Sequence, residues 1–465
     1  MPQPGTEAQP LRVAIIGAGP SGFYAAEQLL SSPKLVATVD LFDRLPTPYG
    51  LVRYGVAPDH QKIKAVTAAY DKTAAHPRFR FFGNVEFGKH VSRRDLAAYY
   101  HQILFTTGAQ TDRRMGIPGE DLGGSYPATD FVAWYNGHPD YVRHTFDLQQ
   151  ESAAVVGVGN VAVDVARILL RSPDELATTD IADYALDALR ESRVRDVHLL
   201  GRRGPAQAAF TNPEIRELGD LSSSDVVVRP EEVALDDLSR AALDRTQDRT
   251  TMRKVEILQG FVTRPPAGRP RRLHIRFLVS PVEVRGADGR MTGLRLVHNV
   301  LQATPAGTLV ARATDRFEDL AAGLVFRSVG YRGVPLPDVP FHQDWGVILN
   351  EKGRVLDPDS RQPVVGLYAA GWIKRGPTGV IGTNKPDAAE TVDAMIEDAA
   401  QGSILDPTEP SAAAAEAFVR GRQPQVISYP DWLRLNQLEV EKGRALGRPR
   451  VKFTRVEEML AALGR

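Results

Sequence analysis

The chain has 465 residues, enough for two or three domains, and its 43% hydrophobic and 25% charged residues are typical of a globular protein. Lysine plus arginine equals aspartate plus glutamate at 57 each, so no net basic charge indicates nucleic acid or a membrane surface as a partner. The sequence contains no cysteine, which excludes disulfides, thiolate metal ligands, cysteine-bound iron–sulfur clusters and redox-active thiol pairs.

The N-terminal sequence MPQPGTEAQP does not resemble a signal or transit peptide, because no basic segment precedes an apolar run. The sequence also lacks a run of about 18 apolar residues, so we expect no membrane insertion. We therefore expect a cytoplasmic protein that binds no nucleic acid, with a monomer as the default state.

A strand, a glycine turn and a helix are predicted at the start of the chain. Residues 11–16 form an apolar run typical of a buried parallel strand, and residues 23–30 have a helical pattern. Between them lies GAGPSG, in which Gly17 permits a tight turn out of the strand. Gly19 lets backbone amides approach a pyrophosphate, and Gly22 lets the helix pack closely on the strand. This context indicates a dinucleotide site rather than a merely structural turn.

An acidic residue follows the next predicted strand, residues 34–43, at the distance expected for a ribose ligand. Asp43 ends that strand, and its carboxylate can accept both ribose hydroxyls, which suits FAD or NAD but not NADP. Asp40 is the second choice, since it lies inside the strand, and the alternative for Asp43 is a solvated acid at a strand end.

A second strand–turn–helix pattern begins near residue 153. Its turn is GVGNVA, with Gly157 and Gly159 in the first two glycine positions and Ala162 in the third. The next strand, residues 194–200, leads to Arg202 and Arg203, where the first unit has Asp43. Two guanidinium groups can bind a 2′-phosphate, so this unit is predicted to bind NADP(H). The alternative is a solvated arginine pair.

The rest of the chain gives weaker patterns. Residues 171–193 are an insertion predicted to be partly helical, and residues 225–315 are predicted to contain a small antiparallel sheet. Its two extended segments, residues 272–285 and 290–301, are predicted to be joined by a turn at residues 287–289. Residues 324–329 and 365–369 are predicted strands. The C-terminal residues 431–465 are predicted to be mostly helical, with Thr454 and Glu457 as a capping box on the last helix.

The predicted fold is α/β with two Rossmann-like dinucleotide-binding domains. We expect a discontinuous FAD-binding domain, residues 1–112 and 333–465, with an NADP-binding domain that includes the antiparallel sheet inserted at residues 113–332. The first site is expected to reject a nucleotide with a 2′-phosphate, and the second is expected to select one. Together they indicate hydride transfer from NADPH to FAD N5. Because the chain has no cysteine, the electrons must leave for an acceptor outside it.

The sequence resembles the adrenodoxin-reductase-like ferredoxin–NADP reductases, a family that includes the bacterial FprA-type reductases. The resemblance covers nearly the whole chain, and its most specific motifs are LPTPYGLVRYGVAPDHQKIK at residues 45–64 and GWIKRGPTGVIGTNKPDA at residues 371–388. Further matching stretches lie at residues 13–26, 78–88, 155–170, 199–218 and 325–335.

The resemblance implies FAD contacts at both ends of the chain. Asp43 stands where the family usually has glutamate, so its shorter side chain is expected to make a longer or water-mediated ribose contact. Thr383 or Asn384 is expected to cap a helix whose positive end lies near the flavin. The other implied FAD residues are Ser21, Leu51, Val85, Trp372, Gly379, Val380 and Ile381.

The resemblance also implies the NADP contacts and the residues nearest the reaction. Glu214 is expected at the nicotinamide end, and Trp372 is expected to contact the flavin and to border the nicotinamide. His60 is expected near the flavin, where it either assists proton balance or shapes the pocket, and we favour the structural role. For Asp59 a structural role is favoured still more strongly. The remaining implied NADP residues are Arg113, Val158, Asn160 and Val161, with Gly379 on the nicotinamide side.

The predicted function is that of an NADPH:ferredoxin oxidoreductase whose electron acceptor is a separate iron–sulfur ferredoxin. An acidic ferredoxin would suit a basic patch, for which Arg216, Arg240, Arg245 and Arg249 are candidates. The rival interpretations are an NADPH diaphorase or quinone reductase, a flavin monooxygenase, and a non-catalytic NADP(H)-sensing flavoprotein.

Overall fold

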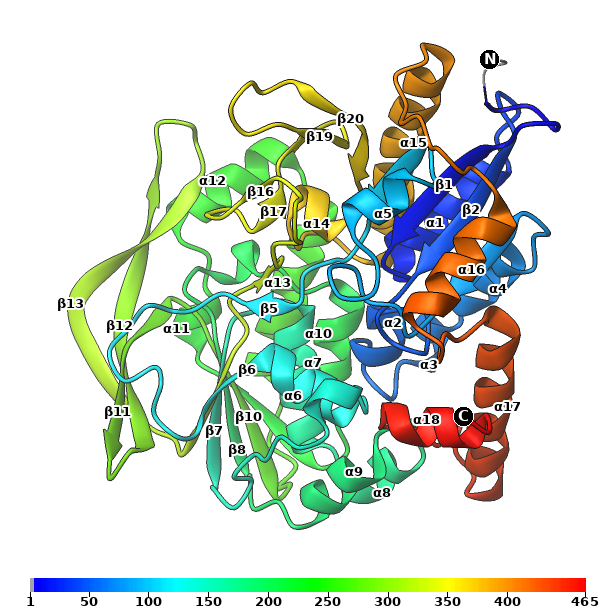
Figure 1. The fold of residues 1–465 in the computed structure, drawn as a ribbon. Coiled ribbons are helices and arrows are strands. Elements are labelled where there is room, and N and C mark those ends of the chain that lie inside the picture. The colour runs from blue at the N-terminus through cyan, green and yellow to red at the C-terminus, as the bar shows by residue number, and fades with distance from the viewer. Residues whose placement is uncertain (1–3) are drawn as a thin grey trace. The chain divides into compact units, whose positions relative to one another are not determined.

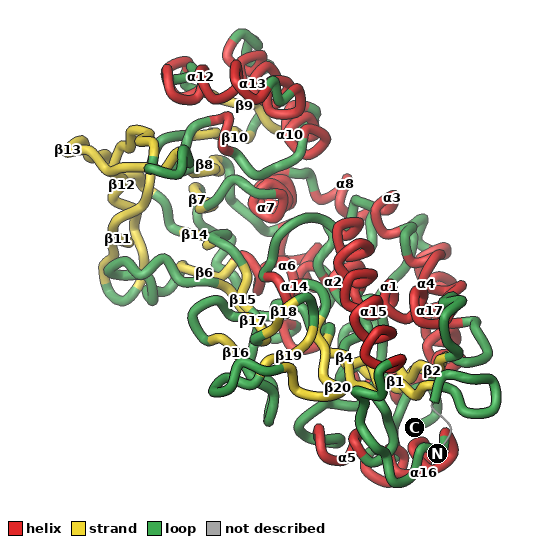
Figure 2. Tube along the Cα trace, turned by 90° about the horizontal axis from the view of Figure 1, so that it is seen from above, coloured by secondary structure: helices red, strands yellow, loops and turns green. Residues whose placement is uncertain are grey.

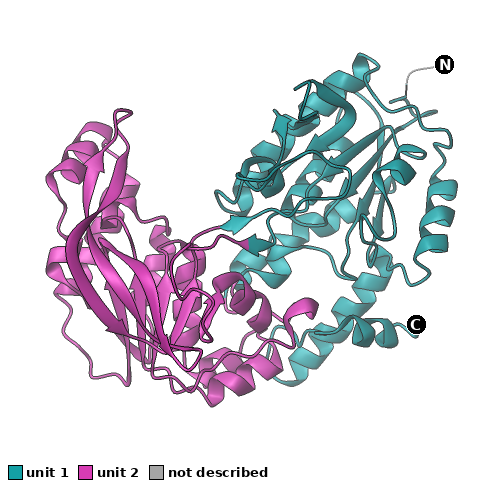
Figure 3. Cartoon of the chain, turned by 60° about the vertical axis from the view of Figure 1, so that its left-hand side comes forward, with its two compact units in different colours: residues 1–56, 60–111, 331–465 teal, residues 57–59, 112–330 magenta. Residues whose placement is uncertain are grey.

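A computed structural model describes residues 4–465, and these residues divide into two compact units (Figure 3). Unit 1 consists of Met1–Val56, His60–Thr111 and Tyr331–Arg465. Unit 2 consists of Ala57–Asp59 and Asp112–Gly330. No helix within residues 4–465 has the length and apolar character needed to cross a membrane.

Unit 1 is built on a seven-stranded sheet with strands from both ends of the chain. Its order is β18-β19-β20-β4-β1-β2-β3, and β20 pairs in parallel with β4. Figure 2 shows β20, β4, β1 and β2 following one another in this sheet. The strands are β1 Leu11–Ile16, β2 Ala37–Phe42, β3 Phe79–Phe82, β4 Gln102–Phe105, β18 Asn350–Glu351, β19 Arg354–Leu356 and β20 Pro363–Ala369.

Both faces of this sheet are covered, which explains why β1 is apolar at every position. Val13 and Ile15 belong to one hydrophobic cluster, whereas Ala14 and Ile16 belong to another, because successive side chains point to opposite faces. On the first face, helix α1 (Pro20–Leu30) packs against α15 (Asn384–Ala400). Both ends of the chain therefore contribute to the hydrophobic clusters on the two faces of this sheet.

Unit 2 is built on a six-stranded parallel sheet of order β6-β14-β7-β8-β10-β9. Its two faces carry separate hydrophobic clusters, in which Ala153 and Val155 of β7 lie on one side and Ala154 and Val156 on the other. The strands are β6 Ser125–Pro127, β7 Ser152–Val156, β8 Asp196–Leu200, β9 Ser224–Val228, β10 Arg271–Arg276 and β14 Leu324–Arg327. The predicted α/β class with two Rossmann-like sheets is confirmed.

A three-stranded antiparallel sheet, β11-β12-β13, completes unit 2 (Figure 1). Its strands are β11 Val279–Ala287, β12 Arg290–Ala303 and β13 Leu309–Ala321. The predicted turn is present, because Ala287 pairs with Arg290 across Asp288 and Gly289, both at positive φ. However, the single extended segment expected before this turn is wrong, since the chain breaks after Phe277 and contributes β10 to one sheet and β11 to the other.

The predicted helices at residues 23–30, 171–193 and 431–465 are present, whereas the helices within residues 230–262 were not predicted. The last helix, α18 (Val456–Ala462), begins after Arg455 and has no side-chain cap, so the expected capping box of Thr454 and Glu457 is wrong. The remaining helices of unit 1 are α2 Leu51–Tyr54, α3 Gln61–Lys64, α4 Thr67–Ala74, α5 Arg93–Ala97, α14 Trp372–Arg375, α16 Ala412–Arg422 and α17 Tyr429–Ala445. Those of unit 2 are α6 Ala128–Tyr135, α7 Asn160–Leu170, α8 Pro173–Ala177, α9 Asp183–Arg190, α10 Asn212–Gly219, α11 Pro230–Val233, α12 Asp237–Thr246 and α13 Arg249–Val262.

Candidate functional site

The first glycine turn has the shape that a pyrophosphate site requires. Gly17 has φ +111°, and a Cβ at this position would lie 2.7 Å from the carbonyl oxygen of Thr106. A Cβ on Gly19 would meet nothing within 4 Å, so the space above the start of α1 is open. Gly22 packs against the carbonyl of Gly17, which holds helix and strand together. The backbone at the start of α1 can therefore be approached closely at Gly19, as phosphate binding needs.

The motif at residues 45–64 crosses this glycine turn. The amide of Tyr49 donates to the carbonyl of Ala18 at 2.7 Å, and a Cβ on Gly50 would lie 3.0 Å from the Cα of Gly19. Leu51 follows, with 37% of its surface exposed although it is apolar. The motif thus brings Leu51 close to the glycine turn, where its apolar side chain is available to a ligand.

Asp43 and Asp40 have different roles. The Asp43 carboxylate accepts hydrogen bonds from the amides of Ala18 at 2.8 Å and Leu45 at 2.9 Å, which fix it beside the glycine turn. Burial raises the pKa of Asp43 above its ordinary value, although these hydrogen bonds lower it. The carbonyl of Asp43 accepts from the amide of Val85 at 2.8 Å, so Asp43 and Val85 are adjacent.

Asp40, by contrast, is buried in an ion-paired cluster. Its carboxylate contacts Arg12 at 3.0 Å and Arg80 at 2.6 Å, and it accepts a hydrogen bond from Tyr100 at 2.7 Å. These three partners occupy the carboxylate, so Asp40 is a structural residue. Asp43 is the acid that could meet a ribose.

The C-terminal motif lies against the same helix start. The hydroxyl of Ser21 donates to Asn384 Oδ1 at 3.0 Å, and a Cβ on Gly371 would lie 2.0 Å from the Ser21 oxygen. The amide of Gly371 donates to Asp387 at 2.5 Å. Sequence reasoning missed both contacts: the partner of Asn384 lies 363 residues away, and the partner of Asp387 lies 16 residues away within the same motif, where no local pattern indicates the pairing.

The segment after Trp372 forms an exposed turn. The Trp372 indole donates to the carbonyl of Thr378 at 3.2 Å, and its ring centroid lies 5.4 Å from that of Tyr331. Gly379, Val380 and Ile381 come next, and Val380 is 51% exposed. The turn therefore presents apolar and backbone groups to its surroundings.

The expected side-chain cap on α15 is wrong. Thr383 precedes the helix but has helical dihedral angles, φ −69° and ψ −15°, so its hydroxyl donates backward to the carbonyl of Val380 at 2.7 Å. The Asn384 amide donates to the carbonyl of Ile381 at 3.0 Å. Both side chains stabilise the short 3-10 turn Ile381–Thr383 instead of the helix amides.

The second glycine turn repeats the geometry of the first. Gly157 has φ +131°, and a Cβ there would lie 2.2 Å from the carbonyl oxygen of Ser328. The space beside Gly159 is again open within 4 Å. Ala162 is fully buried in the third position, so a methyl group is accommodated there. Val161 lies in the first turn of α7 and packs partly buried on the core.

The residues after this turn hold a second segment over it. The carbonyl of Val158 accepts the amides of Ala209 at 2.9 Å and Phe210 at 3.0 Å. Asn160 accepts the amide of Thr211 at 2.9 Å, at the residue that precedes α10. Helix α10 carries Glu214, which is 7% exposed. The nucleotide turn and α10 are thus bound to each other.

Arg202 and Arg203 form an uncompensated pair of cations. Arg202 is exposed and Arg203 partly buried, and within residues 4–465 no carboxylate forms an ion pair with either guanidinium. Burial, followed by the charge of Arg202, lowers the pKa of Arg203 below that of an ordinary arginine. Two adjacent cations without a carboxylate are suited to a doubly charged phosphate.

Three further residues named in the sequence analysis are Arg113, His60 and Asp59. Arg113 is exposed, and its amide donates to the carbonyl of Gly330 at 2.8 Å. His60 precedes α3 and does not cap it with its side chain. The carboxylate of Asp59 pairs with the fully buried Arg167 at 2.6 Å and with Arg171 at 3.0 Å, which gives Asp59 a structural role.

The candidate docking arginines are all exposed on helices of unit 2. Arg216 lies on α10, Arg240 and Arg245 lie on α12, and Arg249 begins α13. Each is in the position of a surface residue, and their role in docking stays a prediction.

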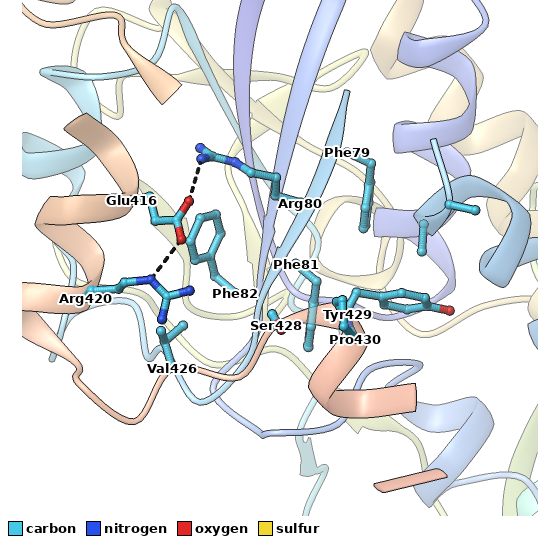
Figure 4. Close-up of a pocket in the computed structure, with 12 residues that line it drawn as sticks. Phe79, Arg80, Phe81, Phe82, Glu416, Arg420, Val426, Ser428, Tyr429 and Pro430 are labelled. Atoms are coloured by element: carbon cyan, nitrogen blue, oxygen red, sulfur yellow. Dashed lines mark hydrogen bonds and ion pairs between the residues drawn. The ribbon is translucent and has the colours of Figure 1, made fainter. Parts of the chain in front are cut away.

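A pocket of about 360 Å³ lies away from the predicted ligand residues, between β3, α16 and the start of α17 (Figure 4). Its charged side chains neutralise one another, because Glu416 pairs with Arg80 at 3.3 Å and with Arg420 at 2.8 Å. None of the predicted site residues lines it. The pocket therefore carries no assignment.

Comparisons with known proteins confirm the resemblance. Residues 11–217 match the family described as "Pyridine nucleotide-disulphide oxidoreductase". The chain is 45% identical over 461 residues to the NADPH-ferredoxin reductase FprA of Mycobacterium tuberculosis, covering 97% of this chain and 99% of that protein. It is 39% identical to a mitochondrial NADPH:adrenodoxin oxidoreductase of Arabidopsis thaliana, covering 98% of this chain and 96% of that protein.

A solved structure agrees with the sequence comparison. The structure titled "Mycobacterium tuberculosis FprA in complex with NADPH" matches with a TM-score of 0.92 at 44% identity, covering 98% of this chain and 100% of that one. The similarity thus extends over both units.

Proposed function

Because the chain belongs to the NADPH-ferredoxin reductase family, we propose that it oxidises NADPH and passes the electrons to a ferredoxin. The observation that carries this proposal is the contrast between two similar glycine turns. A carboxylate, Asp43, is fixed beside the first, and two guanidinium groups that pair with no carboxylate of residues 4–465 follow the strand after the second. One turn suits FAD and the other suits NADPH.

The residues of unit 1 would hold FAD. The open space at Gly19 and the amides of α1 suit its pyrophosphate, Asp43 suits its adenosine ribose, and Trp372 with the exposed turn Gly379–Ile381 suits the isoalloxazine end. Bound FAD supplies the conversion between a two-electron hydride donor and a one-electron acceptor. Leu51 and Val85 line the same site in this proposal.

Most of the residues that would select and orient NADPH belong to unit 2, whereas Gly379 and His60 belong to unit 1. Gly157, Gly159 and the amides of α7 bind the pyrophosphate, and Arg202 and Arg203 bind the 2′-phosphate. Arg113 adds a further NADP contact, whereas Glu214 and Gly379 orient the nicotinamide. His60 shapes the flavin pocket. No residue has to transfer a proton for hydride to move between the two ring systems.

The partner is a separate ferredoxin-type iron–sulfur protein, since this chain has no cysteine to hold a cluster or accept electrons as a thiol pair. We further propose that the protein acts as a monomer in the cytoplasm. The arginines of α10, α12 and α13 suit an acidic partner.

The test follows flavin absorbance in a stopped-flow experiment. NADPH should reduce the yellow protein much faster than NADH does, and an added ferredoxin should reoxidise it and support cytochrome c reduction. Turnover with quinones alone would instead favour the diaphorase interpretation, and a flavin that NADPH leaves oxidised would contradict the proposal altogether.

A further inference from the structure

The loop that carries Arg202 and Arg203 is held by the segment between β10 and β11. Gly201 donates its amide to the carbonyl of Arg276 at 2.9 Å. In return, the Leu278 amide donates to the carbonyl of Arg203 at 3.2 Å, and the Val279 amide donates to Gly201 at 3.1 Å. The two residues on either side of Arg202 are therefore fixed by backbone hydrogen bonds.

The turn that makes this possible is strained. Leu278 has φ +56°, a left-handed conformation that a leucine rarely adopts. Such strain persists only where the surroundings enforce it, and it is concentrated at functional positions. Here it separates β10 from β11 and leaves the Leu278 amide bonded to the arginine loop.

The carbonyl of Arg202 itself is held by a side chain from the antiparallel sheet. Asn299 on β12 is 7% exposed, and its Nδ2 donates to the Arg202 oxygen at 3.0 Å and to Ser280 Oγ at 2.8 Å. Its backbone amide also donates to the carbonyl of Leu278 at 2.7 Å. A carbonyl can only accept, so this contact requires the nitrogen of the Asn299 amide to face Arg202.

An irregularity in the sheet accompanies this contact. The pairing of β12 with β13 shifts between Val297 and Asn299, so the regular ladder is interrupted just before the asparagine. Interruptions of this kind re-aim a side chain next to a binding site. The antiparallel sheet thus supplies one buried amide to the loop of the nucleotide-binding sheet.

We propose that Asn299 is a positioning residue for the 2′-phosphate of NADPH: its amide holds the Arg202 carbonyl and so fixes where the arginine pair meets the phosphate. The inference rests on the proposed function of Arg202 and Arg203. Adjacent cations repel each other, and no carboxylate within residues 4–465 restrains them. A backbone fixed in advance lowers the entropy lost when the phosphate binds.

The experiment measures binding by isothermal titration calorimetry on the FAD-loaded full chain. The probes are 2′,5′-ADP, which carries the 2′-phosphate, and 5′-AMP, which lacks it. Asn299→Ala should weaken 2′,5′-ADP about three- to tenfold, as expected for one lost hydrogen bond, and should leave 5′-AMP within about twofold. Asn299→Leu keeps a branched side chain at this position but loses the donor without adding charge, and should show the same selective loss.

The matched control is Gln302→Ala on the same strand. Gln302 accepts a hydrogen bond from Arg312 at 2.9 Å within the antiparallel sheet, and both probes should bind this variant as they bind the wild type. Equal weakening of both probes by Asn299→Ala and Asn299→Leu, or no weakening by either variant, would overturn the inference.

Failure of the proposed function would look different. In that case the unmodified protein would bind 2′,5′-ADP no better than 5′-AMP, and Arg202→Ala would change neither affinity. The wild type and Arg202→Ala therefore test the 2′-phosphate site itself, whereas the Asn299 variants test how that site is held.

Discussion

Two aspartates three positions apart in one strand region show how much a side chain's partners decide its role. Asp40 has arginine partners and is buried, whereas Asp43 has only backbone amides as hydrogen-bond donors. Each oxygen of Asp43 accepts one such bond and keeps a further lone pair. That leaves Asp43 able to accept ribose hydroxyls in a fixed orientation.

Asp43→Asn should therefore weaken FAD retention. The asparagine has one acceptor oxygen, so its amide nitrogen would face a backbone N–H, and the charge that strengthens the ribose contact is lost. We expect a loss of about one to two decades in FAD affinity, measured from the fluorescence of released FAD after dilution. A variant that retains FAD as tightly as the wild type would contradict the ribose role.

The pH dependence of FAD release provides a second check on this residue. Because burial raises the pKa of Asp43, the carboxylate becomes protonated at a higher pH than an ordinary aspartate does. Protonation removes an acceptor from the ribose, so wild-type FAD affinity should fall as pH drops through this raised pKa. Asp43→Asn should lack that component of the pH profile.

At the level of elements, the sequence was most informative where local chemistry is self-contained. The strand over residues 11–16 is observed with the predicted bounds, because an apolar run next to a glycine turn has few alternatives. The break after Phe277 could not be predicted, since the left-handed residue is Leu278 and not glycine or asparagine. Strand β13 was missed because its residues are mostly exposed or half-buried.

The candidate site divides in the same way. The glycine turns, Asp43 and the arginine pair could be located because each stands at a fixed distance from a strand. The residues that hold them in place could not be predicted. Ser21 meets Asn384 and Arg202 meets Asn299, and no local pattern links residues so far apart in the chain.

Helix α17 is joined to α2 by a buried ion pair. Glu439 is fully buried and contacts Arg53 at 2.5 Å, and it also accepts the Phe453 amide at 2.9 Å. Burial raises the pKa of Glu439, but the charge of Arg53, the hydrogen bonds from Arg53 and the Phe453 amide, and the charge of Arg450 together outweigh this, so the net effect is a lowered pKa. The pair thus ties α17 to the segment that crosses the first glycine turn.

Glu439→Gln should destabilise the protein by about 3–5 kcal/mol, because it leaves the Arg53 charge buried without a partner. A lowered folded-state pKa means that the stabilisation is fully present above the ordinary glutamate pKa and is lost as pH falls through the folded value. The difference in free energy of unfolding between wild type and variant, measured by chemical denaturation, should therefore shrink in acid.

Glu458→Gln, in an exposed pair with Arg455, is the control and should change stability by less than about 1 kcal/mol. Equal effects of the two substitutions would contradict this role.

For the whole molecule, the two units differ in how they depend on chain connectivity. Unit 1 needs both chain ends, since β20 pairs with β4 and the side chain of Gln102 donates to the carbonyl of Met395 at 2.8 Å. Unit 2 is nearly continuous, and both of its sheets and both of its hydrophobic clusters come from Asp112–Gly330. Its one remote addition is the segment Ala57–Asp59.

An excised fragment of residues 112–330 should therefore fold and bind nucleotide without FAD. It lacks Asp59, but the buried Arg167 keeps Asp164 at 3.1 Å and Glu217 at 3.1 Å, so we expect a lower melting temperature and not an unfolded chain. Circular dichroism should show a cooperative thermal transition, and calorimetry should give a 2′,5′-ADP affinity within about threefold of the full chain.

The matched fragment of residues 1–111 lacks β20 and α15 and should neither fold cooperatively nor become yellow with FAD. Loss of 2′,5′-ADP binding by the first fragment, or a stable flavin complex of the second, would show that the two units are not independent in this way.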